Sequence, residues 1–263
     1  MKPRIAIPVP NSKRPLYVGI ALPQYEEAVR KAGGEPVVIE LDASPSQIAQ
    51  AVKQCDGVLL PGSPADVDPE KYGASRHAKT AAADPLRDNT DELLLQDAYN
   101  MRKPVLGICY GLQSLNVWRT GTLDQHVPSL INHEAGRSVP QAHRVRIDPA
   151  SKLAAILRDG GAVVGDSEPT IAVNSSHHQA AAVLGDGLRL SAWSDEDDVK
   201  EAFEGTAPDH FVLAVQWHPE RTYSSEPASR AIFHAFVEAA ADWHERLRSK
   251  QQDFESLSRS QQL

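Results

Sequence analysis

One short segment constrains this chain more than any other. Residues 104–108 form an apolar run of strand length, and apolar side chains then recur at helical spacing. The change of period falls on residues 107–111, which read Gly-Ile-Cys-Tyr-Gly. This pattern is the cysteine counterpart of a nucleophile elbow, a tight strand-to-helix turn that exposes its central side chain. The alternative is a buried cysteine at an ordinary turn between a strand and a helix.

Such a turn suits nucleophilic chemistry for two physical reasons. The glycines two residues to either side of Cys109 let the backbone turn tightly and let a substrate approach. The amino end of the following helix offers free N–H groups and the positive end of the helix dipole, and both favour a thiolate and a developing oxyanion. Cys109 is therefore a candidate catalytic nucleophile.

The composition excludes several classes of function. A chain of 263 residues, 41% hydrophobic and 24% charged, can bury a sizeable core and is typical of a soluble globular protein. The net charge of −8 argues against nucleic acid and anionic membranes as partners, and no apolar run reaches membrane-spanning length. The two cysteines, Cys55 and Cys109, form no Cys-x-x-Cys, which argues against a disulfide framework or a cysteine zinc site. We therefore expect a cytoplasmic protein.

Short apolar runs alternate with helical patterns in the first part of the chain. Strands are expected at residues 5–9, 36–39 and 57–60, with intervening helices at 23–32 and after Ser44-Pro45. This order predicts an α/β fold with a doubly wound, mostly parallel sheet flanked by helices. The later patterns at 143–147, 170–173, 188–193 and 199–204 instead predict a small antiparallel β addition.

No linker or internal repeat divides the chain. We expect a single domain over residues 1–248, which closes with a long amphipathic helix at about 229–247. Residues 249–263 are rich in Gln and Ser and poor in apolar side chains. This composition predicts a disordered polar tail.

His218 is the favoured base for Cys109. It follows an apolar run at 211–216, so a parallel pairing with the elbow strand would place both residues at the same sheet edge. Pro219 favours an extended backbone at His218, and Glu220 would then share its face and fix the imidazole tautomer. The alternative is a surface histidine beside a loop glutamate.

Two polar pairs are open to a metal interpretation that we do not favour. Asp66 and Asp68 fit a solvated loop of turn-forming aspartates better, because no histidine or carboxylate cluster lies near them in sequence. His177 and His178 fit a substrate-contacting loop better, because no third ligand accompanies them. Strand-like alternation would turn only one of these two histidines into a cleft.

Three further histidines have no clear role in the sequence. His133 and His143 are ambiguous, and His126 follows the elbow helix, where it could line a cleft without an orienting partner. No metal site is predicted.

Several motifs together resemble those of class I glutamine amidotransferases, and more closely the stand-alone γ-glutamyl hydrolase branch of that family. Besides the elbow and Gln216-Trp217-His218-Pro219-Glu220, the matching segments are Leu60-Pro61-Gly62 with Asp66-Val67-Asp68-Pro69, Arg87-Asp88 with Glu92, Gly121-Thr122-Leu123 with Gln125, Asn174-Ser175-Ser176-His177-His178-Gln179 and Glu201-Ala202-Phe203-Glu204. They follow the family's order over most of the chain. The resemblance implies the flavodoxin-like fold of class I glutamine amidotransferases.

The resemblance also implies a set of roles. Cys109 would attack the γ-carbonyl of a small γ-glutamyl amide, with His218 as base and Glu220 as the carboxylate that orients it. The backbone N–H groups of Gly62 and Tyr110 would form the oxyanion hole. Polar side chains would hold the glutamyl group: Gln113, Ser176, His177, His178 and Gln179. No cofactor or metal is implied, the expected partner is the small-molecule substrate, and a homodimer stays open.

The sequence departs from the family pattern near the nucleophile. Tyr110 stands where arginine is usual, Ser63 replaces a second glycine, and Trp118-Arg119-Thr120 replaces smaller residues. We expect Tyr110 and the bulky side chains at 118 and 119 to bear on specificity at the leaving-group side of the pocket. Two other functions stay open, namely a glutaminase subunit that supplies ammonia to a separate synthetase and a binding or regulatory protein with an idle triad.

Overall fold

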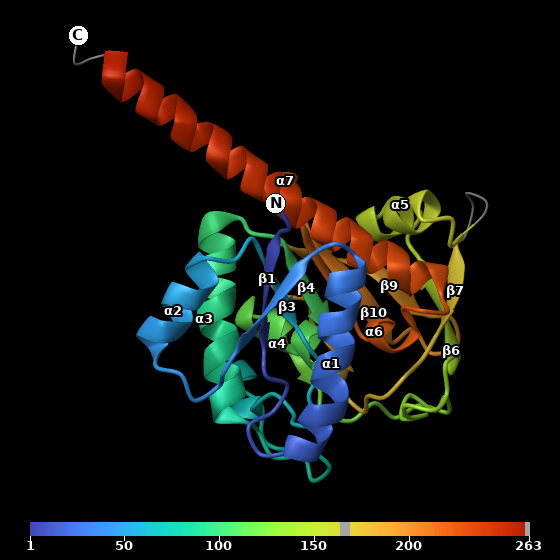
Figure 1. Cartoon of the computed structure of the whole chain (residues 1–263). Coiled ribbons are helices and arrows are strands. Elements are labelled where there is room, and N and C mark those ends of the chain that lie inside the picture. The colour runs from blue at the N-terminus through green and yellow to red at the C-terminus, as the bar shows by residue number, and fades with distance from the viewer. Residues whose placement is uncertain (164–168, 261–263) are drawn as a thin grey trace.

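A nine-stranded sheet forms the centre of the computed structural model, which describes residues 1–163 and 169–260, with only the backbone described from residue 250 on (Figure 1). Five neighbouring strands run parallel, in the order β2 (Glu35–Ile39), β1 (Arg4–Pro8), β3 (Gly57–Leu60), β4 (Val105–Ile108) and β11 (Val212–Val215). The expected doubly wound parallel sheet is confirmed. The elbow strand β4 lies within it, between β3 and β11.

Antiparallel strands extend the same sheet beyond β11. They are β10 (Lys200–Gly205), β9 (Leu188–Ser194), β6 (His143–Ile147) and β7 (Thr170–Val173). A separate two-stranded sheet pairs β5 (Leu123–Asp124) with β8 (Ala180–Ala181). The antiparallel addition is thus confirmed, and most of it continues the main sheet because β10 pairs with β11 and the other three strands follow in turn.

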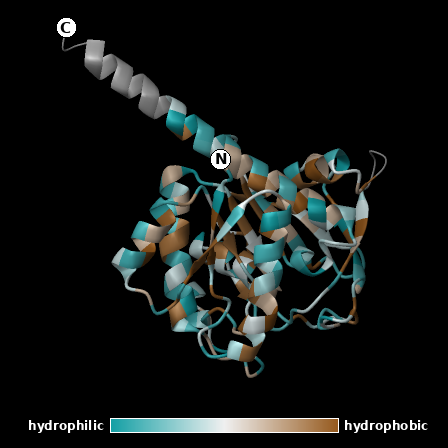
Figure 2. Cartoon of the chain, viewed as in Figure 1, coloured by the Kyte–Doolittle hydropathy of each residue, from teal (hydrophilic) through white to brown (hydrophobic). Residues whose placement is uncertain are grey.

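Helices cover both faces of the sheet. On one face, α1 (Pro15–Lys31), α5 (Lys152–Asp159) and α7 (Pro227–Ser260) pack into one apolar cluster. On the other, α2 (Pro45–Lys53), α3 (Pro85–Met101) and α4 (Tyr110–Trp118) pack into a second. Successive residues of β11 alternate between the two clusters, as the two-residue period of a strand requires. Figure 2 accordingly shows hydrophobic residues along the central strands and many hydrophilic residues along the surrounding helices.

Two helix boundaries differ from the expected ones. Helix α1 begins at Pro15 rather than near residue 23, because Pro15 suits a first helical turn and Pro23 is tolerated on the exposed side. Helix α7 runs to Ser260, past the expected end near residue 247 and through most of the expected disordered tail. No Gly or Pro follows Pro227 to stop it. Residues 261–263 of that tail lie outside the described part.

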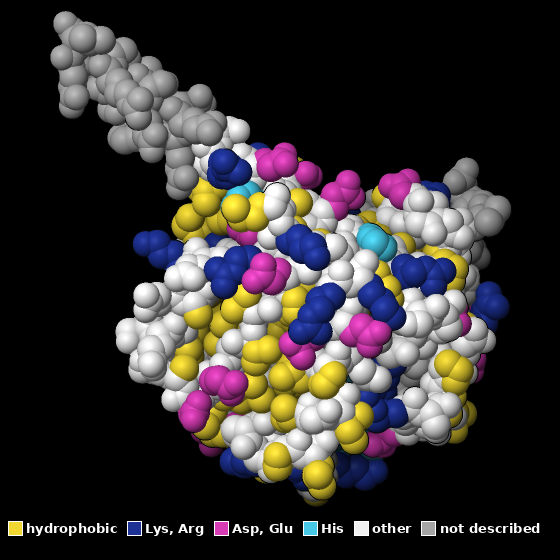
Figure 3. Space-filling view, viewed as in Figure 1, with side chains coloured by type: hydrophobic (Ala, Val, Ile, Leu, Met, Phe, Trp, Pro, Cys, Tyr) yellow, Lys and Arg dark blue, Asp and Glu magenta, His cyan; other side chains and the backbone are white. Residues whose placement is uncertain are grey.

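One side of the molecular surface carries charges of both signs. Figure 3 shows acidic and basic side chains interspersed over the face that carries α1, without a patch of one sign. Among the described residues, no helix is long and apolar enough to cross a membrane.

The short helix α6 (Pro219–Thr222) and the 3₁₀ turn η1 (Pro69–Tyr72) complete the described elements, and both follow the carboxyl ends of parallel strands. Ligands bind at this edge in open α/β sheets. The carboxyl edge of β3, β4 and β11 is therefore where a site is expected.

The packing of α4 against β3 generates a stability prediction. A Cβ at Gly111 would lie 2.1 Å from the Leu60 carbonyl oxygen, which no real contact allows. Gly111→Ala should therefore lower the free energy of unfolding by about 3 kcal/mol or more. Urea denaturation measures this change.

A matched control is available on α1. A Cβ at Gly19 meets no atom within 4 Å, so Gly19→Ala should raise the free energy of unfolding by about 1 kcal/mol through helix propensity alone. Equal effects of the two substitutions would contradict the close approach of α4 to β3.

Candidate active site

Cys109 lies at a strained turn between β4 and α4. Its backbone has φ 53° and ψ −107°, a left-handed φ that non-glycine residues rarely adopt, and it precedes the first residue of α4. A Cβ at Gly107 would lie 2.9 Å from the Gly111 carbonyl oxygen, so both flanking glycines are needed for the tight turn. The strain and the glycines match a nucleophile elbow.

His218 reaches the same edge through the neighbouring strand. Strands β4 and β11 pair in parallel with Ile108 opposite Val215, and the Cys109 N–H donates to the Val215 carbonyl at 2.8 Å. His218 follows three residues later, buried to 2% exposure. The expected parallel pairing thus brings the ends of the two strands together.

Glu220 contacts His218 by a different local geometry from the one expected. The distance from His218 Nδ1 to Glu220 Oε1 is 2.8 Å, and both side chains are buried. The segment is not extended throughout, because Pro219 opens α6 and places Glu220 in the first turn of that helix. The shared face that we expected from an extended strand is therefore wrong, although the contact itself is present.

Gly62 lies against both Cys109 and His218. A Cβ at this position would lie 2.8 Å from His218 Cε1 and 3.5 Å from Cys109 Cβ, so the three residues are immediate neighbours. The Gly62 N–H donates to the Tyr25 hydroxyl at 3.0 Å. The amide expected in the oxyanion hole is therefore already engaged by a buried tyrosine from α1, a partner that the sequence did not indicate.

Burial shifts the pKa values of Cys109 and His218. It raises the pKa of the Cys109 thiol to about 12, against the opposing charge of Arg221 and a hydrogen bond from the Tyr110 backbone. It lowers the pKa of His218 to about 4, against the opposing charge of Glu220. Burial alone would raise the pKa of Glu220, but His218 and Arg221 lower it overall. At neutral pH the resting site therefore holds a thiol, a neutral imidazole and a carboxylate.

Asn174 fixes the backbone of His218. Its side-chain amide donates to the His218 carbonyl at 2.8 Å and accepts the His218 N–H at 2.9 Å. Sequence reasoning assigned Asn174 no role, because the two residues lie 44 positions apart. Its position directly before the polar segment 175–179 was the available signal.

The side chains expected to hold a substrate form several contacts within the protein. Gln113 Nε2 donates to the Gln179 carbonyl at 3.1 Å and to Gln216 Oε1 at 3.3 Å. Ser176 Oγ accepts a hydrogen bond from Arg221 Nη1 at 2.7 Å. These contacts join Gln113 to the segment that follows β11 and Ser176 to α6, the two elements that flank His218.

The two adjacent histidines point to different partners. His177 has one ring nitrogen 3.0 Å from the Gln179 carbonyl and the other 3.5 Å from Glu201, whereas His178 lies 3.1 Å from Asp66. Both nevertheless line one cavity of about 360 Å³. The expectation that only one enters a cleft is wrong, because this segment is irregular rather than a strand.

Asp66 is a buried anchor rather than a solvated turn residue. Its carboxylate accepts the Ala81 N–H at 2.6 Å and Gln179 Nε2 at 3.0 Å, besides the contact with His178. Asp68, in contrast, accepts the Glu70 N–H at the start of η1, as a turn-forming aspartate does. We interpreted the two aspartates alike from the sequence, because their difference in burial becomes visible only in the folded structure.

The departures from the family pattern serve packing. The Tyr110 hydroxyl donates to Asp88, and its ring lies 4.8 Å from the Arg87 guanidinium, in an apolar cluster that includes Val67. Trp118 packs on Tyr99, at the far end of α4 and about 13 Å along its axis from Cys109. The expected effect of Trp118 and Arg119 at the leaving-group side therefore has no direct contact to support it.

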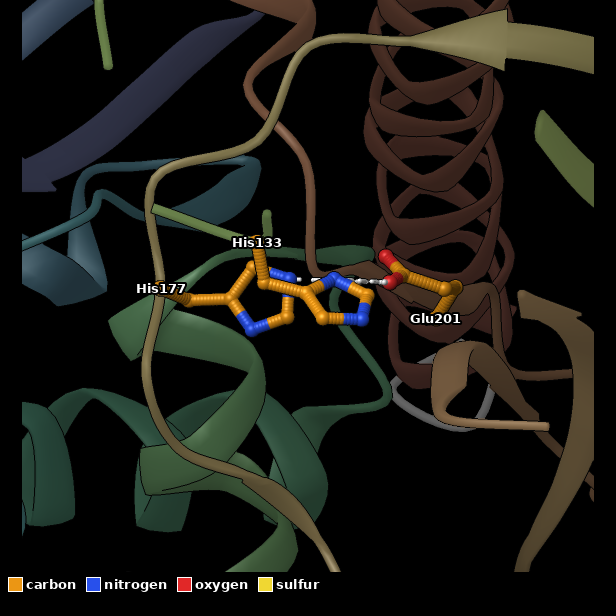
Figure 4. A group of neighbouring side chains, drawn as sticks. All are labelled: His133, His177 and Glu201. Atoms are coloured by element: carbon orange, nitrogen blue, oxygen red, sulfur yellow. Dashed lines mark ion pairs between the residues drawn. The ribbon is translucent and has the colours of Figure 1, made fainter. Parts of the chain in front are cut away.

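A second buried polar group was missed by sequence reasoning. His133, His143 and His177 surround Glu201, which is 0% exposed. Figure 4 shows His133, His177 and Glu201. Burial would raise the pKa of the Glu201 carboxyl group, but His177 and His143 outweigh it and lower that pKa to about 2. The four residues come from distant segments, so no local spacing predicted their meeting.

The overall arrangement is that of class I glutamine amidotransferases. A crystal structure from Thermoplasma acidophilum, provisionally assigned as one subunit of a GMP synthase, superposes with a TM-score of 0.61 over 94% of this chain and 98% of the other. The sequence identity is only 16%, so this likeness concerns the fold.

Sequence comparison identifies the family directly. The model of the peptidase C26 family matches residues 15–220, and the chain belongs to that family. It is 33% identical to the γ-glutamyl-γ-aminobutyrate hydrolase PuuD of Escherichia coli, over 82% of this chain and 84% of the relative. It is 35% identical to a provisionally named glutamine amidotransferase of Mycobacterium tuberculosis, over 83% and 67%. The chain is thus a class I amidotransferase-like hydrolase, as the motifs predicted.

Proposed function

We propose that this protein hydrolyses the γ-glutamyl amide bond of a small γ-glutamyl compound and releases glutamate through a thioester on Cys109. The observation that carries the proposal is the meeting of Cys109, the His218–Glu220 pair and Gly62 at one sheet edge. The relatives named γ-glutamyl-γ-aminobutyrate hydrolase support this class of substrate.

The first half of the reaction forms the thioester. As the Cys109 sulfur bonds to the γ-carbonyl carbon, its proton passes to His218 Nε2, because Nδ1 already donates to Glu220. The carbon–nitrogen bond then breaks, and His218 returns the proton to the leaving amine. Glu220 stabilises the transient imidazolium and keeps the ring in this tautomer.

The second half releases glutamate. His218 takes a proton from water while the water oxygen attacks the thioester carbonyl. The carbon–sulfur bond breaks, and the proton on His218 returns to the Cys109 sulfur. The products are glutamate and the resting thiol, so the cycle needs no cofactor.

Two backbone amides would stabilise the oxyanion in both halves. The Tyr110 N–H already points at the Cys109 sulfur and stands at the amino end of α4, where the helix dipole favours negative charge. The Gly62 N–H can contribute once the oxyanion replaces the Tyr25 hydroxyl as its acceptor. An oxyanion is the stronger acceptor, since charge-assisted hydrogen bonds exceed neutral ones.

Charge complementarity fits a glutamyl group. The positive charge of Arg221 partly offsets the effect of burial, which raises the pKa of the Cys109 thiol. The Arg221 side chain also contacts Ser176 and Glu220. We assign Arg221 to the α-carboxylate of the substrate and Gln113 to its α-amino group. The free thiols Cys55 and Cys109 suit a reducing cytoplasm.

A glutaminase subunit is the second candidate function, because one relative at 35% identity is provisionally named a glutamine amidotransferase. The same chemistry would then release ammonia from glutamine for a separate synthetase. Steady-state turnover of the purified chain distinguishes the two. Full activity on larger γ-glutamyl amides without a partner favours the hydrolase, and activity on glutamine that appears only with a partner favours the glutaminase.

Replacement of the nucleophile tests the proposed reaction. Wild-type protein should release glutamate from one or more members of a panel of γ-glutamyl amides, measured by mass spectrometry. Cys109→Ala should lower the rate more than about 1,000-fold, since no other group can form the thioester. Cys55→Ala is the matched control and should retain the rate within a few-fold, because Cys55 is buried beside α2 and donates to Ala51. An inactive wild type across the panel, or an active Cys109→Ala, would contradict the proposal.

The pKa of His218 predicts the acid limb of the pH profile. The base must be neutral, so kcat/KM should stay nearly constant from pH 8 down to about 5 and fall as pH passes about 4. An ordinary histidine would place this limb near pH 6.5. Circular dichroism at each pH, with a return to pH 7 before a second assay, separates titration from unfolding. A limb near pH 6.5 in folded protein would show that His218 is not the buried base described here.

A further inference from the structure

A buried group of ligand-type side chains lies outside the catalytic triad. His133, His177 and Glu201 are at most 4% exposed, and one nitrogen or oxygen atom of each lies within 4.8 Å of the others. They come from the loop between β5 and β6, the segment between β7 and β8, and strand β10, respectively. Figure 4 shows the two imidazole rings side by side, turned toward the carboxylate.

The outer contacts of the two histidines fix their tautomers. His133 Nε2 lies 2.9 Å from the Asp197 carboxylate, and His177 Nδ1 lies 3.0 Å from the Gln179 carbonyl. Both of these oxygens can only accept hydrogen bonds. The ring hydrogens therefore sit on the outer nitrogens, and the inner nitrogens of the neutral rings carry lone pairs.

Those lone pairs face a carboxylate. His133 Nδ1 and His177 Nε2 each lie 3.5 Å from Glu201 Oε1. Among the described residues, neither nitrogen has a hydrogen-bond partner, and Glu201 Oε2 has none either. Glu201 Oε1 is held by His143 Nε2, but with both rings neutral no hydrogen lies between this oxygen and the two inner nitrogens. A shared cation would relieve the repulsion among these three buried atoms.

We propose that His133, His177 and Glu201 bind a divalent transition metal, with Zn²⁺ as the best match. Tetrahedral zinc with bonds of about 2.0–2.1 Å holds its ligand atoms about 3.3 Å apart. The two nitrogen-to-oxygen separations of 3.5 Å are close to this value. Two imidazoles and one carboxylate suit zinc, whereas calcium and magnesium prefer oxygen ligands alone.

The surroundings have the features that accompany metal sites. Asp197 and the Gln179 carbonyl accept the outer ring hydrogens, which orients ligand histidines and raises their basicity. His143 Nε2 lies 3.0 Å from Glu201 Oε1 and holds the carboxylate in place. The cavity of about 360 Å³ lined by His133 and His177 supplies an access path and room for a fourth, water ligand.

Such a metal would brace the catalytic histidine. The His133 carbonyl accepts hydrogen bonds from Ser175 Oγ at 2.8 Å and from the His177 N–H at 2.9 Å. A bond from each histidine to the metal would add a second link between these two segments. Asn174, next in the chain to Ser175, holds both backbone groups of His218. The metal is thus a structural link, separate from the proton transfers of the proposed reaction.

The test is zinc binding by the tag-free full chain. After removal of metals with a chelator, Zn²⁺ is titrated in competition with a fluorescent zinc indicator, and Co²⁺ is added separately for absorption spectroscopy. We expect one Zn²⁺ per chain, a rise in Tm with zinc, and the intense visible bands of four-coordinate Co²⁺. Glu201→Gln and His177→Gln should abolish stoichiometric binding and the rise in Tm. His143→Gln should weaken binding about 10–100-fold.

His126→Gln is the matched control, because His126 lines the same cavity but contacts Lys79, His77 and His178 instead of Glu201. It should keep the zinc stoichiometry and the Co²⁺ spectrum. Circular dichroism verifies that each variant is folded. Absence of stoichiometric zinc binding by the wild type would overturn the proposal and leave a proton as the shared cation. Loss of binding in His126→Gln with retention in Glu201→Gln would also overturn it, since the metal would then sit on the exposed histidines. Glutamate release by zinc-free protein leaves the proposed hydrolysis intact, so the two proposals fail independently.

Discussion

The parallel pairing of β4 with β11 is the interaction on which the site depends. Its register sets Ile108 opposite Val215, so the two chains leave the sheet side by side and deliver Cys109 and His218 to one edge. A one-residue slip would turn every side chain of β11 to the other face of the sheet and exchange its two apolar clusters. The packing of β11 against both apolar clusters therefore helps to fix the geometry of the candidate site.

Close backbone approach is the second constraint. Gly111 lets α4 contact the end of β3, and Gly62 leaves room for the imidazole of His218 beside Cys109. The strained turn at Cys109 persists because Gly107, Gly111 and the strands on either side hold it. Asn174 holds His218, and the next residue, Ser175, donates to the His133 carbonyl. These hydrogen bonds connect the site to the histidines around Glu201. The close backbone contacts that hold the fold together thus also position the residues of the candidate site.

The sequence predicted what is encoded locally and missed what requires distant segments to meet. The period change at Cys109, the strand before His218 and the alternation of strands and helices were sufficient for the fold class and the two halves of the candidate site. The engagement of the Gly62 amide by Tyr25 and the group around Glu201 were not predictable, because their members lie tens of residues apart. We expected the Tyr110 side chain to bear on specificity, but it bonds to Asp88, a contact that no local pattern indicates.

The most direct measurement of the central claim is the rate at which a glutamine-mimicking electrophile labels the protein, followed by peptide mass spectrometry. If Cys109 and His218 act as one unit, the label should appear on the Cys109 peptide at one per chain, and a γ-glutamyl amide should protect it. His218→Ala should slow labelling by at least about 100-fold, because the buried thiol then lacks its base. Labelling of Cys55 instead, or an equal rate in folded His218→Ala, would contradict the account.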